Sequence, residues 1–101
     1  MAKDALRTVA SAEATYQATE GNGSYGSSDQ LIAKGLVSKE LFERYGYRIE
    51  VTVSGKSYEA RAVPLEYGKS GKMSFFVDES GVIRGGDKGG GAATVADGPV
   101  N

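Results

Sequence analysis

The stretch that decides the fold is AKDALRTVASAEATYQATE, residues 2–20, in which the apolar residues recur at helical spacing. Steps of three and four place these residues on one stripe of a helix, with charged and hydroxyl side chains around the rest. No glycine or proline interrupts the stretch before Gly21. The pattern predicts an amphipathic helix from residue 2 to about residue 20 whose stripe packs on another element. The stripe consists of Ala2, Ala5, Leu6, Val9, Ala12 and Tyr16.

A long connection follows, the αβ-loop of residues 21–45, and we expect it to contain two short helical segments. Residues 21–28 are rich in glycine, serine and asparagine, which end a helix and are too polar to bury. Ser28 is the expected N-cap of a helix over residues 29–34, and Ser38 that of a further turn or two over residues 39–44. Apolar residues are expected to clamp this connection onto the helix and the sheet edge. They are Leu31, Ile32, Leu36, Val37, Leu41 and Phe42.

From Tyr47 to Val53 the apolar period changes to two, which is typical of a half-buried strand. The run Ser54-Gly55-Lys56-Ser57 signals a tight turn, and a return strand follows over residues 58–62. A two-residue turn places Glu50 opposite Arg61. This pair of opposite charges on the solvent face would be worth about 0.2–1 kcal/mol.

A third strand is predicted over residues 73–77, with Met73, Phe75 and Val77 inward, and a short last strand over residues 82–84. Residues 85–91 are too glycine-rich to hold regular structure, and the last ten residues are expected to be mobile unless they dock. The chain therefore divides into a head over residues 1–84 and a glycine-rich tail over residues 85–101. The order predicts an α+β fold, one helix packed on three or four antiparallel strands. The expected helix–sheet contact consists of Leu6, Val9, Ala12, Tyr16, Ile49, Val51 and Phe75.

Composition excludes several classes of function. Across 101 residues, 12 basic and 13 acidic side chains are interspersed, so the basic patch of a nucleic-acid binder is missing. Histidine and cysteine are both absent, which removes the commonest general base, the commonest transition-metal ligands and any disulfide. No catalytic motif occurs. We therefore expect a protein that is not an enzyme and that needs neither a metal nor a cofactor.

Three other patterns have a functional and a structural interpretation. The glycine run at residues 85–91 lacks the spacing of a phosphate loop and precedes no helix, which favours a flexible tail. Asp78-Glu79-Ser80 with Asp87 could offer oxygens to calcium or an acid–base pair, but the spacing is that of a hairpin turn. Tyrosines in loops are the better candidates for recognition, because loops carry recognition more often than the scaffold does. These candidate subunit contacts are Tyr25, Tyr45 and Tyr67.

Several segments resemble bacterial type IV pilin-like proteins and type II secretion pseudopilins in order and spacing. The likeness spans nearly the whole chain, and its most specific part is the Phe-Phe-Val-Asp-Glu-Ser-Gly-Val-Ile-Arg run at residues 75–84. The other segments are Ala-Glu-Ala-Thr-Tyr at residues 12–16, Gly-Ser-Tyr-Gly at 23–26, Leu31 to Leu36, Tyr-Gly-Tyr-Arg-Ile at 45–49 and Ala-Val-Pro at 62–64.

The resemblance implies a pilin-like fold and a subunit processed by a prepilin peptidase. Its first helix would continue upstream into an apolar half that spans the membrane and then forms the core of a filament. The processing site, the glutamate that follows it and the apolar half are not in this sequence. We therefore expect Met1 to be an artificial start, and the isolated head to be a monomer. The cysteine-free chain also lacks the C-terminal disulfide loop of many pilins.

Two functions from different classes follow. The first is a structural subunit of a type IV pilus or of a type II secretion pseudopilus, with partners in its own copies, other pilins and assembly proteins. Such a subunit would lie at the cell surface, or in the inner membrane and periplasm before assembly. The alternative is a small extracytoplasmic binding domain that recognises a ligand or partner through its tyrosine-bearing loops.

Overall fold

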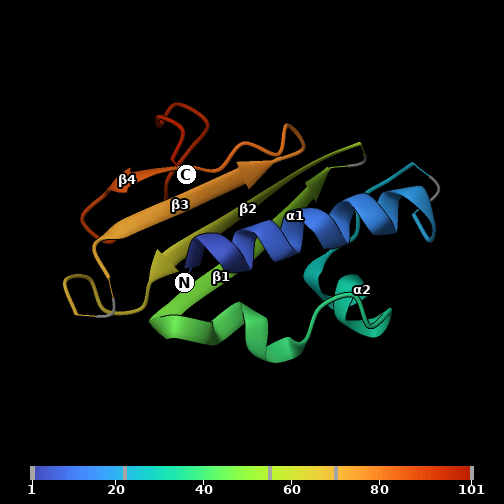
Figure 1. Cartoon of the computed structure of the whole chain (residues 1–101), viewed down its shortest axis with the longest axis horizontal. Helices are drawn as coiled ribbons and strands as arrows, with labels where there is room; N and C mark the ends of the chain where they lie inside the picture. The colour runs from blue at the N-terminus through green and yellow to red at the C-terminus, as the bar shows by residue number, and fades with distance from the viewer. Residues whose placement is uncertain (1, 22, 55, 70, 101) are drawn as a thin grey trace.

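One long helix lies across a four-stranded antiparallel sheet in the computed structural model of the chain (Figure 1). The structure describes residues 2–21, 23–54, 56–69 and 71–100, with the side chains of 2, 3 and 42–45 excepted. The sheet order is β1-β2-β3-β4, so the predicted α+β arrangement of a helix on an antiparallel meander is confirmed. The elements are α1 Ala2–Ala18, α2 Ser28–Ala33, the 3-10 helix η1 Lys39–Gly46, β1 Tyr47–Ser54, β2 Ser57–Pro64, β3 Met73–Asp78 and β4 Arg84–Asp87.

The hydrophobic core lies between α1 and the faces of β2 and β3 beneath it. Ala60 and Ala62 of β2 are fully buried there, and their small side chains let the helix approach the sheet closely. Phe75 and Val77 of β3 point to the same face, because alternate residues of a strand share a side. The predicted inward face of β2 and these two inward residues of β3 are thus confirmed.

Strands β1 and β2 pair in the predicted register, with Ser54 opposite Ser57 and Glu50 opposite Arg61. The expected ion pair between these two residues is wrong, however. The Arg61 guanidinium donates to Glu59 Oε1 at 3.0 Å and to Thr52 Oγ1 at 2.9 Å, while Glu50 pairs with Arg48 at 3.5 Å. A long arginine reaches diagonal neighbours as easily as the residue directly opposite.

The αβ-loop contains both predicted helical segments, but the N-cap of α2 is Ser27 rather than Ser28. Ser27 Oγ accepts from the Gln30 N–H at 3.2 Å, and Gln30 Oε1 accepts from the Ser27 N–H at 2.8 Å. This reciprocal capping box requires Gln three residues after the cap, a spacing that Ser27 has and Ser28 lacks. Gly35 and Gly46, with φ of 71° and 72°, lie just beyond α2 and at the end of η1.

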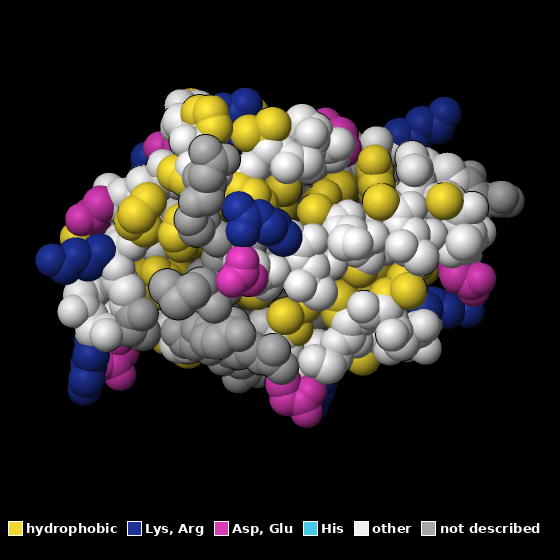
Figure 2. All heavy atoms as spheres, viewed as in Figure 1, with side chains coloured by type: hydrophobic (Ala, Val, Ile, Leu, Met, Phe, Trp, Pro, Cys, Tyr) yellow, Lys and Arg dark blue, Asp and Glu magenta, His cyan; other side chains and the backbone are white. Residues whose placement is uncertain are grey.

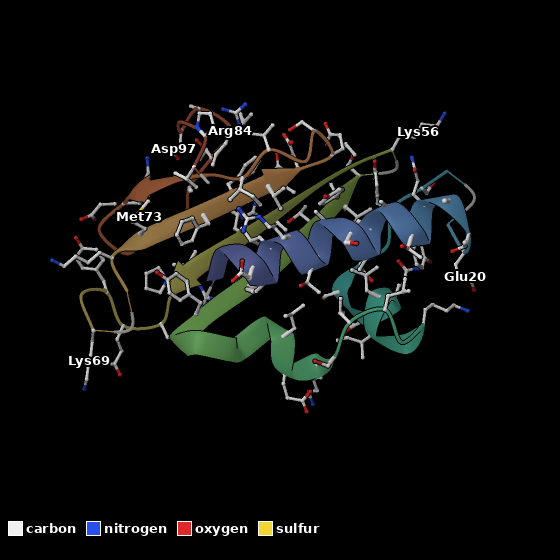
Figure 3. All side chains as sticks on the ribbon, viewed as in Figure 1. Glu20, Lys56, Lys69, Met73, Arg84 and Asp97 are labelled. Atoms are coloured by element: carbon white, nitrogen blue, oxygen red, sulfur yellow. The ribbon has the colours of Figure 1, made fainter. Side chains whose placement is uncertain are left out.

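Strand β3 is buried on both faces, which the sequence did not indicate. Ser74 and Phe76, on the face away from α1, are 0% and 2% exposed. Met73 was predicted to point inward, but its side chain is 37% exposed, so that prediction is wrong. Met73 is the first residue of β3 and lies at the end of the sheet (Figure 3). The last strand is also misplaced, because β4 begins at Arg84 instead of ending there.

The segment after β4 folds back over this second face and along the outer edge of β4. Ser74 Oγ donates to the Gly91 carbonyl at 2.5 Å, and the Val100 N–H donates to the Ile83 carbonyl at 2.8 Å. Ala93 is fully buried, outside the helix–sheet core. Arg84 and Asp97 lie together in Figure 3, where Arg84 Nη1 donates to the Asp97 carbonyl at 3.1 Å.

The expectation that residues 85–91 hold no regular structure is therefore wrong for residues 85–87, which belong to β4. The residues near the C-terminus dock beside β4, as the Val100–Ile83 hydrogen bond shows. The physical reason is close packing. A Cβ at Gly85 would lie 2.5 Å from the Ser74 carbonyl oxygen and 2.9 Å from the Phe75 ring, so only glycine fits there without a shift. At Gly86, the next residue of the strand, a Cβ would meet nothing within 4 Å.

Gly85→Ala should therefore lower the free energy of unfolding by about 1–3 kcal/mol, the usual effect of overpacking. Gly86→Ala is the matched control, because it makes the same chemical change one residue away in open space. Urea unfolding followed by far-UV circular dichroism measures both variants. Equal stability of the two variants would show that β4 does not pack against β3 as described.

Candidate functional site

The side chains predicted to join helix and sheet gather in one cluster. Leu6 and Val9 are 0% exposed, Ala12 and Tyr16 are buried beside them, and all four project from one side of α1. From the sheet, Ile49 and Phe75 are buried in the same cluster, and Val51 is partly buried against it. One side of α1 is thereby fixed to the sheet along nearly its whole length.

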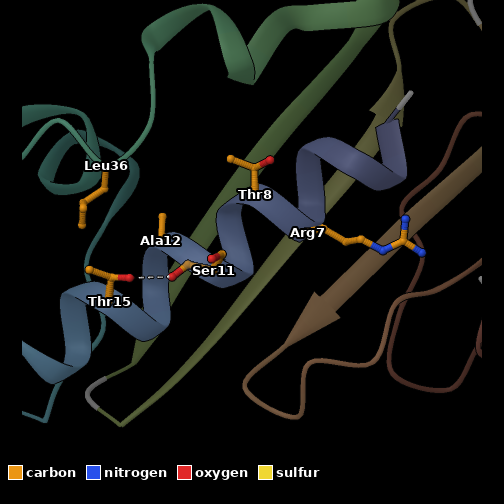
Figure 4. A pocket seen from close by; sticks show the side chains of 6 residues that line it. All are labelled: Arg7, Thr8, Ser11, Ala12, Thr15 and Leu36. Atoms are coloured by element: carbon orange, nitrogen blue, oxygen red, sulfur yellow. Dashed lines mark hydrogen bonds between the residues drawn. The ribbon is translucent and has the colours of Figure 1, made fainter.

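The flank of α1 next to this buried side forms one wall of a shallow groove of about 350 Å³ (Figure 4). Leu36 of the αβ-loop forms the other wall and faces Ala12 and Thr15. The hydroxyl groups of Thr8 and Thr15 donate to helix carbonyls one turn back, at 3.0 Å and 3.1 Å. Because these hydroxyls are satisfied within the helix, the groove offers small, neutral side chains that another backbone can approach closely. Its lining is Arg7, Thr8, Ser11, Ala12, Thr15 and Leu36.

The face of the molecule that carries α1 has few charges at its centre. Figure 2 shows most charged side chains around the rim of this face, and inside the rim one basic and one acidic side chain among apolar and uncharged ones. At one end of the groove, Arg7 pairs with Asp4 at 3.0 Å, and both side chains are more than half exposed. Exposed pairs of this kind contribute little to stability, so the groove's chemistry is dominated by its small side chains.

The three tyrosines proposed as subunit contacts have different environments. Tyr25 is partly buried, and its ring meets Tyr58 edge-on with centroids 4.7 Å apart, so part of it belongs to the fold. Tyr67 is 46% exposed, and its hydroxyl donates to Asp87 Oδ1 at 2.7 Å. That hydrogen bond lowers the pKa of Asp87 and raises the pKa of Tyr67. The side chain of Tyr45 lies outside the described residues.

A second hollow of about 330 Å³ lies at the end of the sheet where β1 begins. Gly46, Leu65, Glu66 and Lys69 line it, and Leu65 is 55% exposed. Lys69 and Met73 lie at this same end of the molecule (Figure 3). The hollow is small and open, and its two charged lining residues, Glu66 and Lys69, lie 3.7 Å apart as an exposed ion pair.

The turn after β3 is an ordinary hydrogen-bonded turn. Asp78 Oδ1 accepts from the Ser80 N–H at 3.0 Å and from the Ser80 hydroxyl at 2.6 Å, so its carboxylate is occupied locally. Asp87, considered with it as an oxygen ligand, is engaged by Tyr67 instead. Among the described residues, no three His, Cys, Asp or Glu side chains are grouped to hold a metal ion.

The sequence analysis missed Glu13, which is 0% exposed inside the core. Its Oε1 accepts from the Gly26 N–H at 2.8 Å, and its Oε2 has no hydrogen-bond partner. Burial raises the pKa of Glu13 from 4.5 to about 6, against the lowering effect of the Gly26 hydrogen bond. Spacing could have revealed this residue, since Glu13 follows Leu6 by seven positions and Val9 by four, on the apolar stripe.

Comparison of the chain with known protein families, curated proteins and solved structures finds no match. Within the described residues, no helix combines the length and apolarity that a bilayer crossing requires.

Proposed function

We propose that this chain is the globular head of a structural, non-enzymatic filament subunit with a pilin-like fold, of the type IV pilus or type II secretion pseudopilus class. Copies of the chain, together with other pilins and assembly proteins, would be its partners. The filament would lie at the cell surface, and unassembled subunits in the inner membrane and periplasm. An apolar helix half upstream of Ala2 would supply the filament core.

The observation that carries the proposal is the division of α1 into two sides. One side is anchored to the sheet by Leu6, Val9 and Tyr16, each at most 8% exposed. The neighbouring flank lines the groove, where Thr8, Ser11 and Thr15 present small, neutral side chains. A helix that is anchored on one side and open along a flank can transmit force between a filament core and a head. The pilin-like segments from residue 12 to residue 84 support the same function.

Two measurements in the organism that encodes the chain test the proposal. Antibodies against the purified chain should label filaments sheared from the cell surface or, for a pseudopilin, a filament fraction of the secretion system. Disruption of the gene should abolish those filaments or the associated secretion. Intact filaments and normal secretion after disruption, with no chain in the sheared fraction, would contradict it.

Accessibility of the groove gives a sharper test, because the chain has no cysteine of its own. Ser11→Cys places a thiol in the groove and Lys56→Cys places one at the exposed β1–β2 turn. In the isolated chain both thiols should react with a maleimide. In assembled filaments the thiol at position 11 should be protected at least tenfold relative to the thiol at position 56. Equal labelling would remove the groove from the subunit interface.

The alternative, a binding domain that uses its tyrosine-bearing loops, is favoured by one observation. Tyr67 exposes its ring beside Gly90, and the nearby end of the sheet also exposes Leu65 and Met73. The sequence encoded upstream of α1 distinguishes a filament subunit from a binding domain. About twenty apolar residues directly before α1 indicate a filament subunit, whereas a cleavable signal peptide indicates a secreted binding domain.

A further inference from the structure

Glu13 joins α1 to a distant part of the αβ-loop by one hydrogen bond. Its Oε1 accepts from the N–H of Gly26, thirteen residues along the chain. The loop lies directly on the ring of Tyr16, since a Cβ at Gly26 would be 3.0 Å from that ring. The loop is thus closed over a carboxyl group that is fully buried and whose second oxygen, Oε2, has no partner.

The ionisable groups that face Glu13 do not favour its charged form. From β2, Tyr58 is only 4% exposed, and burial and the neighbouring Glu13 both raise the pKa of its hydroxyl. From the loop, Tyr25 packs edge-on against Tyr58. Tyr16 lies one turn along on the same side of α1. None of these three tyrosine side chains offers a positive charge that would stabilise an ionised Glu13.

Charged groups stand further out. Asp78 and Glu79 at the end of β3 act on Tyr58, and Glu79 Oε1 accepts from the Tyr58 N–H at 3.4 Å. Lys34, which follows α2 and acts on Tyr16, is paired with Glu20 at 2.8 Å. The lysine is engaged elsewhere, and burial is what disfavours a negative charge on Glu13. Ionised Glu13 keeps a single hydrogen bond, from Gly26, and its charge is solvated only when water enters.

We propose that Glu13 is a pH-sensitive latch for the αβ-loop: its protonated carboxyl holds the loop segment that carries Gly21 and Gly26 closed over Tyr16, and ionisation releases that segment. When the segment opens, water reaches the carboxylate and solvates it. The inference concerns the isolated chain and does not rest on the filament proposal.

The direction of the effect follows from the two protonation equilibria. The closed loop holds the proton more tightly than the open loop, because the pKa of Glu13 is about 6 when buried and 4.5 when solvated. Closure is therefore most favoured below about pH 4.5 and weakens as pH rises through 6. The difference between these two pKa values corresponds to about a 30-fold change in the opening equilibrium.

Amide hydrogen exchange, followed by NMR from pH 4 to 8 and corrected for intrinsic rates, tests the latch. Two amides report on opening of the loop: the Gly21 N–H donates to the Tyr16 carbonyl, and the Gly26 N–H donates to the Glu13 side chain. The Ala60 amide, in β2, reports on opening of the sheet. Loop protection should fall by about 30-fold across this range and should stay below sheet protection at every pH, because the loop opens without global unfolding. In Glu13→Gln, which cannot ionise, loop protection should be independent of pH.

Glu20→Gln is the matched control, because it makes the same change at a glutamate whose side chain is 46% exposed. This variant should keep the pH profile of the parent chain. Loop protection that is constant with pH, that equals sheet protection at every pH, or that still falls in Glu13→Gln would overturn the latch. If Glu13→Gln does not fold, titration of the Glu13 carboxyl carbon in the parent chain decides: a midpoint near 6 supports the latch, and one near 4.5 refutes it.

Discussion

Replacing Leu6 with alanine should lower the free energy of unfolding by about 2–5 kcal/mol, which is the range for deleting a fully buried leucine side chain. Leu6 is 0% exposed and lies on the anchored side of α1, over the core faces of β2 and β3. Its removal costs the transfer free energy of the lost methyl groups and leaves a cavity that a helix anchored at Val9 and Tyr16 cannot close. A domain of this size is stabilised by about 5–15 kcal/mol in total, so the loss is large.

Urea unfolding followed by far-UV circular dichroism gives the midpoint and slope for this variant. Leu65→Ala is the matched control, since it makes the same substitution at a leucine that is 55% exposed. The control should change the free energy of unfolding by less than about 0.5 kcal/mol. If the two variants are equally stable, Leu6 does not pack in the core and the anchored side of α1 has been misidentified.

Repeating patterns in the sequence predicted the helix and the first hairpin. The stripe from Leu6 to Tyr16 fixed which side of α1 faces the sheet, because a helix has one apolar side to bury. The alternation from Tyr47 onward and the run Ser54 to Ser57 determined the register of β1 and β2, because a two-residue turn leaves one pairing. Both features are local, so a single sequence contains enough information to predict them.

The features that were missed depend on contacts between distant segments. The local conformational preference of the glycines at residues 85–91 indicates a flexible segment. Gly85 is nevertheless needed in β4, because the backbone of β4 there lies too close to β3 for a side chain. Glu13 was not predicted to be buried, because carboxylates are seldom buried and the fold of the loop around Tyr16 encloses it. Tyr25 was predicted as a candidate subunit contact, and its ring packs edge-on against Tyr58 with the ring centroids 4.7 Å apart. Local pattern cannot predict such contacts, since it does not say which segments meet.

Replacing Phe76 with alanine should lower the free energy of unfolding by about 3–5 kcal/mol. Phe76 is 2% exposed although it faces away from α1, and the helix–sheet core does not include it. The segment after β4 folds over this face, where Gly91 accepts a hydrogen bond from Ser74, and Ala93 in that segment is also fully buried. We expect the ring to supply apolar surface to that segment, which its removal would take away.

The C-terminal segment should respond to this substitution before the sheet does. In Phe76→Ala, exchange of the Val100 amide, which donates to the Ile83 carbonyl, should accelerate more than exchange of amides in the β1–β2 hairpin. Met73→Ala, at a residue of the same strand that is 37% exposed, should leave both nearly unchanged. A Phe76→Ala chain as stable as the Met73→Ala chain would mean that the second face of β3 is open to solvent. The glycine-rich segment would then be the flexible tail that its composition suggests.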